Sequence, residues 1–99
     1  MNSIKLLALF FVILFNTNSV FASEMLFSKA IELYPDFYEA HYNLAQILMS
    51  LGKNNKALKS LETLNKIKPN DTETLYNLGK VQYKLGFLSN SYDYLKKIM

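Results

Sequence analysis

The sequence of 99 residues contains no cysteine, no arginine and only one histidine. Without cysteine there is no disulfide framework, no thiolate metal site and no attachment point for a bacterial lipoprotein lipid. Bidentate recognition of phosphate or carboxylate groups is usually made by the guanidinium group of arginine, so the absence of arginine counts against it. All 11 basic residues are therefore lysines, and the net charge of +3 is mild. A nucleic-acid reader would need a basic stripe interleaved with exposed aromatic side chains, so no nucleic-acid partner is expected.

Groups for catalysis are equally scarce. A catalytic triad, a catalytic metal with about three protein ligands and a glycine-rich phosphate cradle each need residues at defined spacings. Three scattered glycines and one histidine provide none of these. A cluster of carboxylates is present, and we interpret it as helix starts and a solvated face; it comprises Glu24, Glu32, Asp36 and Glu39. The sequence therefore predicts no enzyme, no catalytic or metal site and no cofactor.

The chain is rich in apolar side chains, at 51% of residues, and 14% of residues are aromatic. This composition is sufficient for a packed core and too apolar for a disordered chain. The length allows one small domain.

Residues 1–22 predict a secretory signal peptide. Lys5 and the amino terminus supply positive charge, residues 6–15 are an uninterrupted apolar run, and a cut after Ala22 would leave Ser23 first. The run is short, since spanning a hydrocarbon core takes roughly 20 apolar residues. The alternative is an uncleaved anchor in the inner membrane, and only then is a membrane partner expected. Usage rich in lysine, asparagine and isoleucine suits a bacterium, so we expect a periplasmic or secreted protein.

After the predicted signal, apolar residues recur at spacings of three and four, which indicates amphipathic helices and no strand. We expect helices over residues 23–34, 38–51, 54–67, 72–85 and 88–98, with Pro35 and Pro69 as breaks and Gly52 and Gly86 in the turns between paired helices. The expected amino-terminal caps are Ser23 once the signal is removed, Asp36, and Ser89 or Asn90. Asn54 or Asn55 is expected to start the third of these helices. The expected inward residues are Leu26, Phe27, Ala30, Ile31, Leu33 or Tyr34, Ala40, His41, Leu44, Ala45, Ile47, Leu48, Ala57, Leu58, Leu61, Leu64 and Ile67.

The chain also repeats itself at an offset of 34 residues. Residues 42–44 recur as 76–78, Leu51-Gly52 as Leu85-Gly86, Leu61 as Leu95, and Pro35 as Pro69. The predicted organisation is therefore a half repeat over 23–37, a full repeat over 38–71 and a truncated repeat over 72–99.

These residues resemble the tetratricopeptide repeat, whose signature is W-x2-L-G-x2-Y, then A-x3-F, then P. The matching letters are His41, Leu44, Ala45, Leu48, Ala57, Leu61 and Pro69 in the full unit, and Leu75, Leu78, Gly79, Gln82, Ser91 and Leu95 in the next. The half unit matches through Ser23, Phe27, Ala30 and Pro35. The resemblance implies an all-α fold, a short solenoid of antiparallel helix pairs with about five helices after the signal. Small residues at Ala45 and Gly79 are expected to let paired helices approach closely, and His41 is interpreted as a core or boundary residue.

The resemblance also implies a function, the binding of an extended peptide or a helix on the concave surface. Because the first helix of each pair lines that surface, the implied partner-binding residues are Glu39, Tyr42, Gln46, Met49 and Ser50, followed by Glu73, Tyr76, Lys80, Tyr83 and Lys84. The alternative interpretation of Tyr42 and Tyr76 is that they only shield the groove. A clamp for a terminal carboxylate is not expected, since Tyr42 and Gln46 replace clamp residues and no arginine exists.

Two further expectations concern the ends and the charge of the chain. The last helix would leave Leu95, Ile98 and Met99 without a covering neighbour, so we expect either self-association through this helix or a remnant of a longer repeat protein. Residues 23–52 carry one lysine against four acidic residues, whereas residues 53–99 carry nine lysines against four. Such asymmetry would attract an acidic partner or align protomers, or it only keeps the outer face soluble. The alternative function is a membrane-tethered assembly factor.

Overall fold

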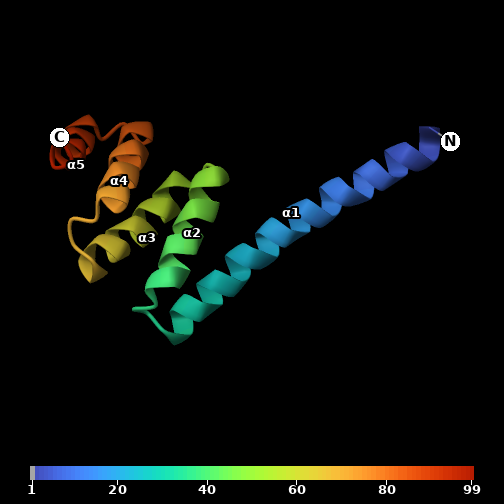
Figure 1. Ribbon diagram of the computed structural model, residues 1–99, viewed down its shortest axis with the longest axis horizontal. Helices are drawn as coiled ribbons and strands as arrows, with labels where there is room; N and C mark the ends of the chain where they lie inside the picture. The colour runs from blue at the N-terminus through green and yellow to red at the C-terminus, as the bar shows by residue number, and fades with distance from the viewer. Residues whose placement is uncertain (1) are drawn as a thin grey trace.

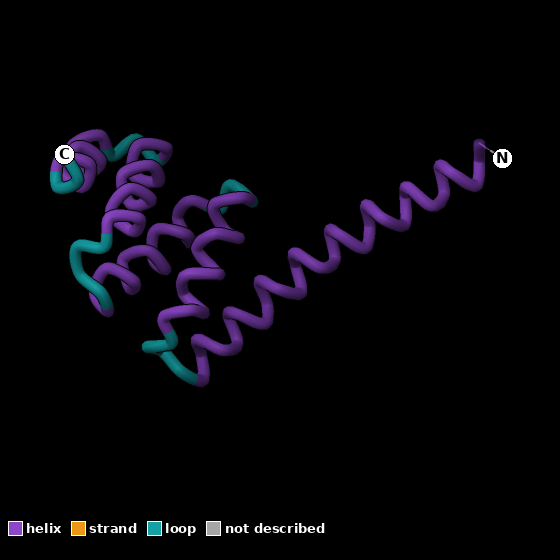
Figure 2. Tube along the Cα trace, in the orientation of Figure 1, coloured by secondary structure: helices purple, strands orange, loops and turns teal. Residues whose placement is uncertain are grey.

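The computed structural model describes residues 2–99, which form five helices and no strand (Figures 1 and 2). The helices are α1 (Asn2–Leu33), α2 (Tyr38–Ser50), α3 (Asn54–Ile67), α4 (Thr72–Lys84) and α5 (Leu88–Lys96). The all-α prediction is confirmed, and the predicted starts of α2 to α5 agree with the structure.

Helix α1 differs from the expectation, because it runs without interruption over 32 residues. The amphipathic helix predicted to begin at Ser23 is its carboxy-terminal part, so Ser23 lies inside this helix. A cap at Ser23 after cleavage stays a prediction. The physical reason is that neither proline nor glycine interrupts residues 2–34. None of the helices, judged on the residues that the structure describes, is long and apolar enough to cross a membrane. Cleavage after Ala22 stays a prediction.

Each helix packs against the next along the chain, which gives the predicted short solenoid. Figure 1 shows the first half of α1 projecting away from the body formed by the other helices. The radius of gyration is 16.9 Å, whereas about 13 Å is usual for a compact domain of this length. The projecting helix accounts for that difference.

The core lies between α2, α3 and α4 and contains most of the predicted apolar stripes. Its fully buried members are Leu44, Ala45, Leu48, Ala57, Leu61, Leu64, Leu78 and Val81. Ile67 was predicted to face inward and is 37% exposed, because it is the last residue of α3. Of the α1 side chains that the structure describes, Phe27 and Ile31 pack against this cluster, while Leu26 is 71% exposed and Leu33 and Tyr34 are also exposed. The prediction of Leu26 and of Leu33 or Tyr34 as inward residues was wrong, because α1 has one helix neighbour and buries one narrow stripe. An ion pair of 2.9 Å between Glu24 and Lys53 also holds α1 to the start of α3.

The two turns inside the helix pairs have the same geometry, 34 residues apart. Gly52 and Gly86 adopt positive φ angles of 73° and 85°, a region that favours glycine. The next residue then donates its amide to the preceding helix, from Lys53 to the Leu48 carbonyl at 2.9 Å and from Phe87 to the Gln82 carbonyl at 2.9 Å. The predicted glycine-terminated turns are confirmed.

The helix caps follow the prediction less well. Among α2 to α5, only α4 has a side-chain cap, in which Asp71 accepts a hydrogen bond of 3.2 Å from the Thr74 amide. Phe37, Lys53 and Phe87 occupy the cap positions of α2, α3 and α5, and none of them makes a capping hydrogen bond. The predicted caps at Asp36 and at Ser89 or Asn90 were wrong, because Asp36 lies one residue before the cap position of α2 and Ser89 and Asn90 lie inside α5. Helix α3 begins at Asn54, as predicted.

Small residues bring paired helices together as predicted. A Cβ atom on Gly79 would lie 2.5 Å from a methyl carbon of Leu95, and Ser91 Oγ donates to the Gly79 carbonyl at 2.7 Å. Ala45 and Ala57 are fully buried in the other pair. Leu95 and Ile98 are therefore half-buried rather than uncovered, whereas Met99 is 92% exposed.

Candidate functional site

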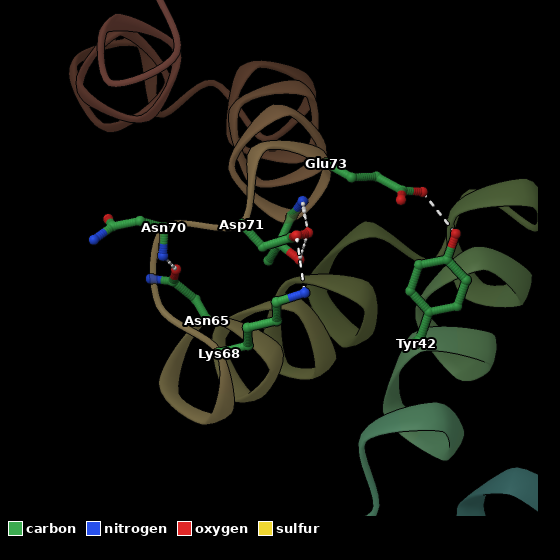
Figure 3. A network of polar contacts seen from close by, with 7 residues as sticks. Tyr42, Asn65, Lys68, Asn70, Asp71 and Glu73 are labelled. Carbon is green, nitrogen blue, oxygen red and sulfur yellow. Dashed lines mark hydrogen bonds and ion pairs between the residues drawn. The ribbon is translucent and has the colours of Figure 1, made fainter.

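The predicted partner-binding residues lie on α2 and α4, the first helices of the two pairs. Tyr42 of α2 and Glu73 of α4 come together, with Tyr42 Oη donating a hydrogen bond of 2.6 Å to Glu73 Oε1 (Figure 3). Glu73 stands in the first turn of α4, which Asp71 caps. The bond therefore links the two repeat units across the surface that they share.

This contact changes the acidity of the phenol. The hydrogen bond to the Glu73 carboxylate, aided by partial burial and by the negative charge of Glu73, raises the pKa of Tyr42 above its ordinary value. The cause is that an ionised phenol would lose the bond and place a second negative charge beside the carboxylate. Tyr42 is thus held as a neutral hydrogen-bond donor at physiological pH.

A second pair forms on α4, where Lys80 Nζ lies 5.1 Å from the centre of the Tyr76 ring. Tyr76 is 51% exposed and Tyr83 is 67% exposed, and Lys84 is exposed beside them. A cation above a ring and two large exposed aromatic side chains form an amphipathic surface suited to contact with another protein.

The other predicted residues do not meet one another. Glu39 and Gln46 are exposed on α2, and Met49 is half-buried and packs against the core. Ser50 donates its hydroxyl to the Ile47 carbonyl at 2.7 Å. The surface carries acidic residues in the first turns of α2 and α4 and a lysine in the last turn of α4.

His41 is a buried residue, as predicted. Its Nε2 lies 2.7 Å from the Pro35 carbonyl, so Nε2 carries the hydrogen and donates it. Its Nδ1 is buried and has no hydrogen-bond partner among the residues that the structure describes. The side chain fixes the turn before α2 and takes no part in the surface on α2 and α4.

Among the clefts that lie elsewhere, two occupy equivalent places in the helix order, and sequence reasoning missed both. A cleft of about 350 Å³ between α1, α2 and α3 is lined by Glu24, Ser28, Ile31, His41, Leu44, Leu48, Lys56, Lys59, Ser60 and Thr63. A cleft of about 330 Å³ between α3, α4 and α5 is lined by Glu62, Gln82, Asn90, Asp93, Tyr94 and Lys97. We call these the first and the second cleft. Neither is lined by any of the predicted partner-binding residues. The signal available in the sequence was the 34-residue offset, which aligns Gln82 with the core residue Leu48.

Sequence models of one family match the chain. A tetratricopeptide repeat model matches residues 26–59, and a TPR repeat model matches residues 45–86. A TPR repeat-containing protein of Methanocaldococcus jannaschii is 32% identical over 84 residues, which cover 78% of this chain and 15% of that protein. The CTR9 homolog of Arabidopsis thaliana is 34% identical over 55 residues, which cover 56% of this chain and 5% of that protein.

The fold is similar to solved structures of MamA. The structure of MamA from Desulfovibrio magneticus RS-1 has a TM-score of 0.75 and 23% identity, and the match covers 88% of this chain and 49% of that one. Another MamA crystal structure has a TM-score of 0.75 and 25% identity, covering 85% of this chain and 49% of that one. The chain thus spans under half of these structures and a small part of the curated relatives.

Proposed function

Because the chain belongs to the tetratricopeptide repeat family, we propose that it is a non-catalytic interaction module that binds a peptide or a helix of another protein in the groove formed by α2 and α4. Members of this fold class stack helix pairs into surfaces that bind protein segments. The observation that carries the proposal is the exposure of Tyr76 and Tyr83 on α4, next to the cations of Lys80 and Lys84.

The distribution of charge supports a defined orientation of the bound segment. Glu39 and Glu73 stand at the amino-terminal ends of α2 and α4, whereas Lys84 stands in the last turn of α4. A segment that places acidic residues near the lysines and basic residues near the carboxylates has the complementary pattern. Complementary charge of this kind mainly fixes the orientation of binding and accelerates association.

The test is capture of a partner from a native envelope extract by the wild-type chain and by the double variant Tyr76→Ala, Tyr83→Ala. Tyr34→Ala is the matched control, because Tyr34 is 67% exposed in the turn between α1 and α2, outside the groove. We expect the partner to be lost from the double variant and kept by the control. Retention of the partner by the double variant, with circular dichroism showing an intact fold, would contradict the proposal.

The location of the protein is part of the same proposal. The positive start, the apolar run over 6–15 and the small residue Ala22 favour export to the bacterial envelope with removal of residues 1–22. The alternative is a membrane-tethered assembly factor, for which the unbroken α1 would serve as a stalk. The intact mass of the native protein distinguishes the two, since cleavage leaves Ser23 as the first residue.

We also propose that the protein self-associates through α5. Leu88 is 61% exposed and Tyr92 59% exposed on this helix. Sedimentation of the full chain at several concentrations tests it, and a monomer at all concentrations would contradict it.

A further inference from the structure

The first and second clefts occupy equivalent positions in successive repeats. Their lining positions correspond at the 34-residue offset as Ser28 and Glu62, Leu48 and Gln82, Lys56 and Asn90, Lys59 and Asp93, Ser60 and Tyr94, and Thr63 and Lys97. The helices around both clefts are equivalent, but every one of these side chains differs. The second cleft replaces two lysines and a leucine with an amide, a carboxylate and a second amide.

The buried side chain of Gln82 has a hydrogen-bonding group that the packing of the helices leaves unsatisfied. It is only 4% exposed, and its Oε1 is buried without a hydrogen-bond partner among the described residues. At the same place in the preceding repeat, Leu48 is 2% exposed and fills the space with no polar atom. A buried acceptor that lacks a donor destabilises the protein, whereas an apolar residue of similar shape does not. A donor from outside the chain would satisfy this oxygen.

The other residues of the second cleft indicate what that donor is. Glu62 and Asp93 present carboxylates, and the only lysine in the lining is Lys97, whose Nζ lies 5.5 Å from the centre of the Tyr94 ring. Two carboxylates against one ammonium group make the cleft locally negative within the lysine-rich half of the chain. Several acceptors beside an aromatic ring suit a planar cation with many N–H groups.

We propose that the second cleft binds the guanidinium group of an arginine side chain from another protein. A guanidinium carries five N–H donors in a fixed plane, pairs with carboxylates in a bidentate manner and stacks on aromatic rings. A second copy of this chain cannot supply it, because the sequence contains no arginine. The occupant is therefore a different protein.

This cleft is separate from the groove. At about 100° per residue, Gln82 lies about 160° around α4 from Lys80, and Glu62, Asn90 and Asp93 belong to α3 and α5. Binding in the second cleft leaves Tyr42, Tyr76 and Tyr83 free. The inference therefore stands or falls independently of the proposed function.

The experiment is a titration of the isotope-labelled full chain, followed by backbone amide NMR. The probes are N-acetyl-arginine amide, N-acetyl-lysine amide and N-acetyl-citrulline amide, the last being a neutral analogue of arginine in shape. We expect saturable shifts at Gln82, Asn90 and Asp93 with the arginine probe, affinity lower by about tenfold with the lysine probe, and no saturation with citrulline. Equal binding of citrulline or lysine would overturn the assignment, as would the absence of any saturable shift.

Two variants and a control complete the test. Gln82→Leu copies the preceding repeat, so we expect it to raise the melting temperature and to weaken the arginine probe by at least about tenfold. Asp93→Asn removes one carboxylate at an exposed position and is expected to weaken the probe while leaving the melting temperature unchanged. Tyr34→Ala, in the turn between α1 and α2, is the control and keeps full affinity. A lower melting temperature for Gln82→Leu would show that Gln82 is satisfied within the fold and would overturn the inference.

Discussion

The two repeat units, α2 with α3 and α4 with α5, have nearly the same backbone and different side chains in equivalent places. Their glycine turns repeat the same φ region and the same amide-to-carbonyl bonds. By contrast, the position of Leu48 in the first unit is Gln82 in the second, and that of His41 is Leu75. The turns and the small residues between paired helices thus fix the architecture, and the positions around the clefts are free to vary in chemistry.

The units also differ in how well they are covered. The first lies between α1 and α4, and Leu61 at its centre is 1% exposed. The second ends with α5, which packs mainly against α4, and Leu95 at the equivalent position is half-buried. We therefore expect Leu61 and Leu95, which are equivalent in the repeat, to contribute differently to the free energy of unfolding.

The largest expected effect comes from truncating these two leucines. Leu61→Ala should lower the free energy of unfolding by about 3–5 kcal/mol, because it removes a fully buried side chain and leaves a cavity. Leu95→Ala should cost only about 1–2 kcal/mol, since its site is partly open. Urea denaturation of both variants measures the difference, and equal losses would contradict the unequal coverage.

The second prediction transfers the polar residue of the second cleft to the first. Leu48→Gln should lower the free energy of unfolding by about 2–3 kcal/mol, because the amide replaces an apolar side chain that is only 2% exposed. The control is Leu48→Met, which conserves volume and should cost less than about 1.5 kcal/mol. Thermal melts of the two variants distinguish a polarity effect from a packing effect.

The third prediction concerns the unequal caps of α2 and α4. Asp71→Ala removes the acceptor of the Thr74 amide and should cost about 1 kcal/mol. Phe37 holds the equivalent position and makes no side-chain capping bond, so Phe37→Asp should stabilise α2 by roughly 0.5–1 kcal/mol. Chemical denaturation of both variants checks the pair, and a loss of stability in Phe37→Asp would show that the Phe37 ring matters more than a cap.

The smallest expected effect is at the bond between Tyr42 and Glu73. Tyr42→Phe should cost no more than about 1 kcal/mol at neutral pH, and Tyr76→Phe, at the equivalent position, should cost less. The folded pKa of Tyr42 is raised, so the stability that the bond contributes is complete below the unfolded pKa of about 10 and is lost as pH rises through the folded pKa. The difference between wild type and Tyr42→Phe should therefore vanish in strong alkali. A difference that grows with alkaline pH would contradict this assignment.

Much of the fold followed from local patterns. The spacing of apolar residues located α2 to α5, because the stripe that repeats every three or four residues is the face that must be buried. The glycines and prolines marked the turns, since only certain residues adopt or interrupt those backbone conformations. The cap predictions failed because Asp36 lies one residue before the cap position of α2, and Ser89 and Asn90 lie inside α5.

The candidate groove was predictable only in part. Family resemblance placed Tyr42, Tyr76 and Lys80 on the first helices of the two pairs, yet it gave no information on their contacts. The bond from Tyr42 to Glu73 depends on how α4 is set against α2, which no helical periodicity specifies. Met49 was predicted as a contact residue and is half-buried against the core, because the edge of the groove and the edge of the core share that position.

The sequence by itself determined the repeat, the helices, the turns and the membership in a solenoid class, because each of these depends on residues close together in the chain. Only the tertiary structure decided that α1 buries one narrow stripe, that Leu95 covers Gly79, and that Gln82 sits buried in a cleft bounded by three helices. The physical reason is that burial and hydrogen bonding of a side chain depend on the distance to atoms of other helices. That distance is set by packing of the whole solenoid.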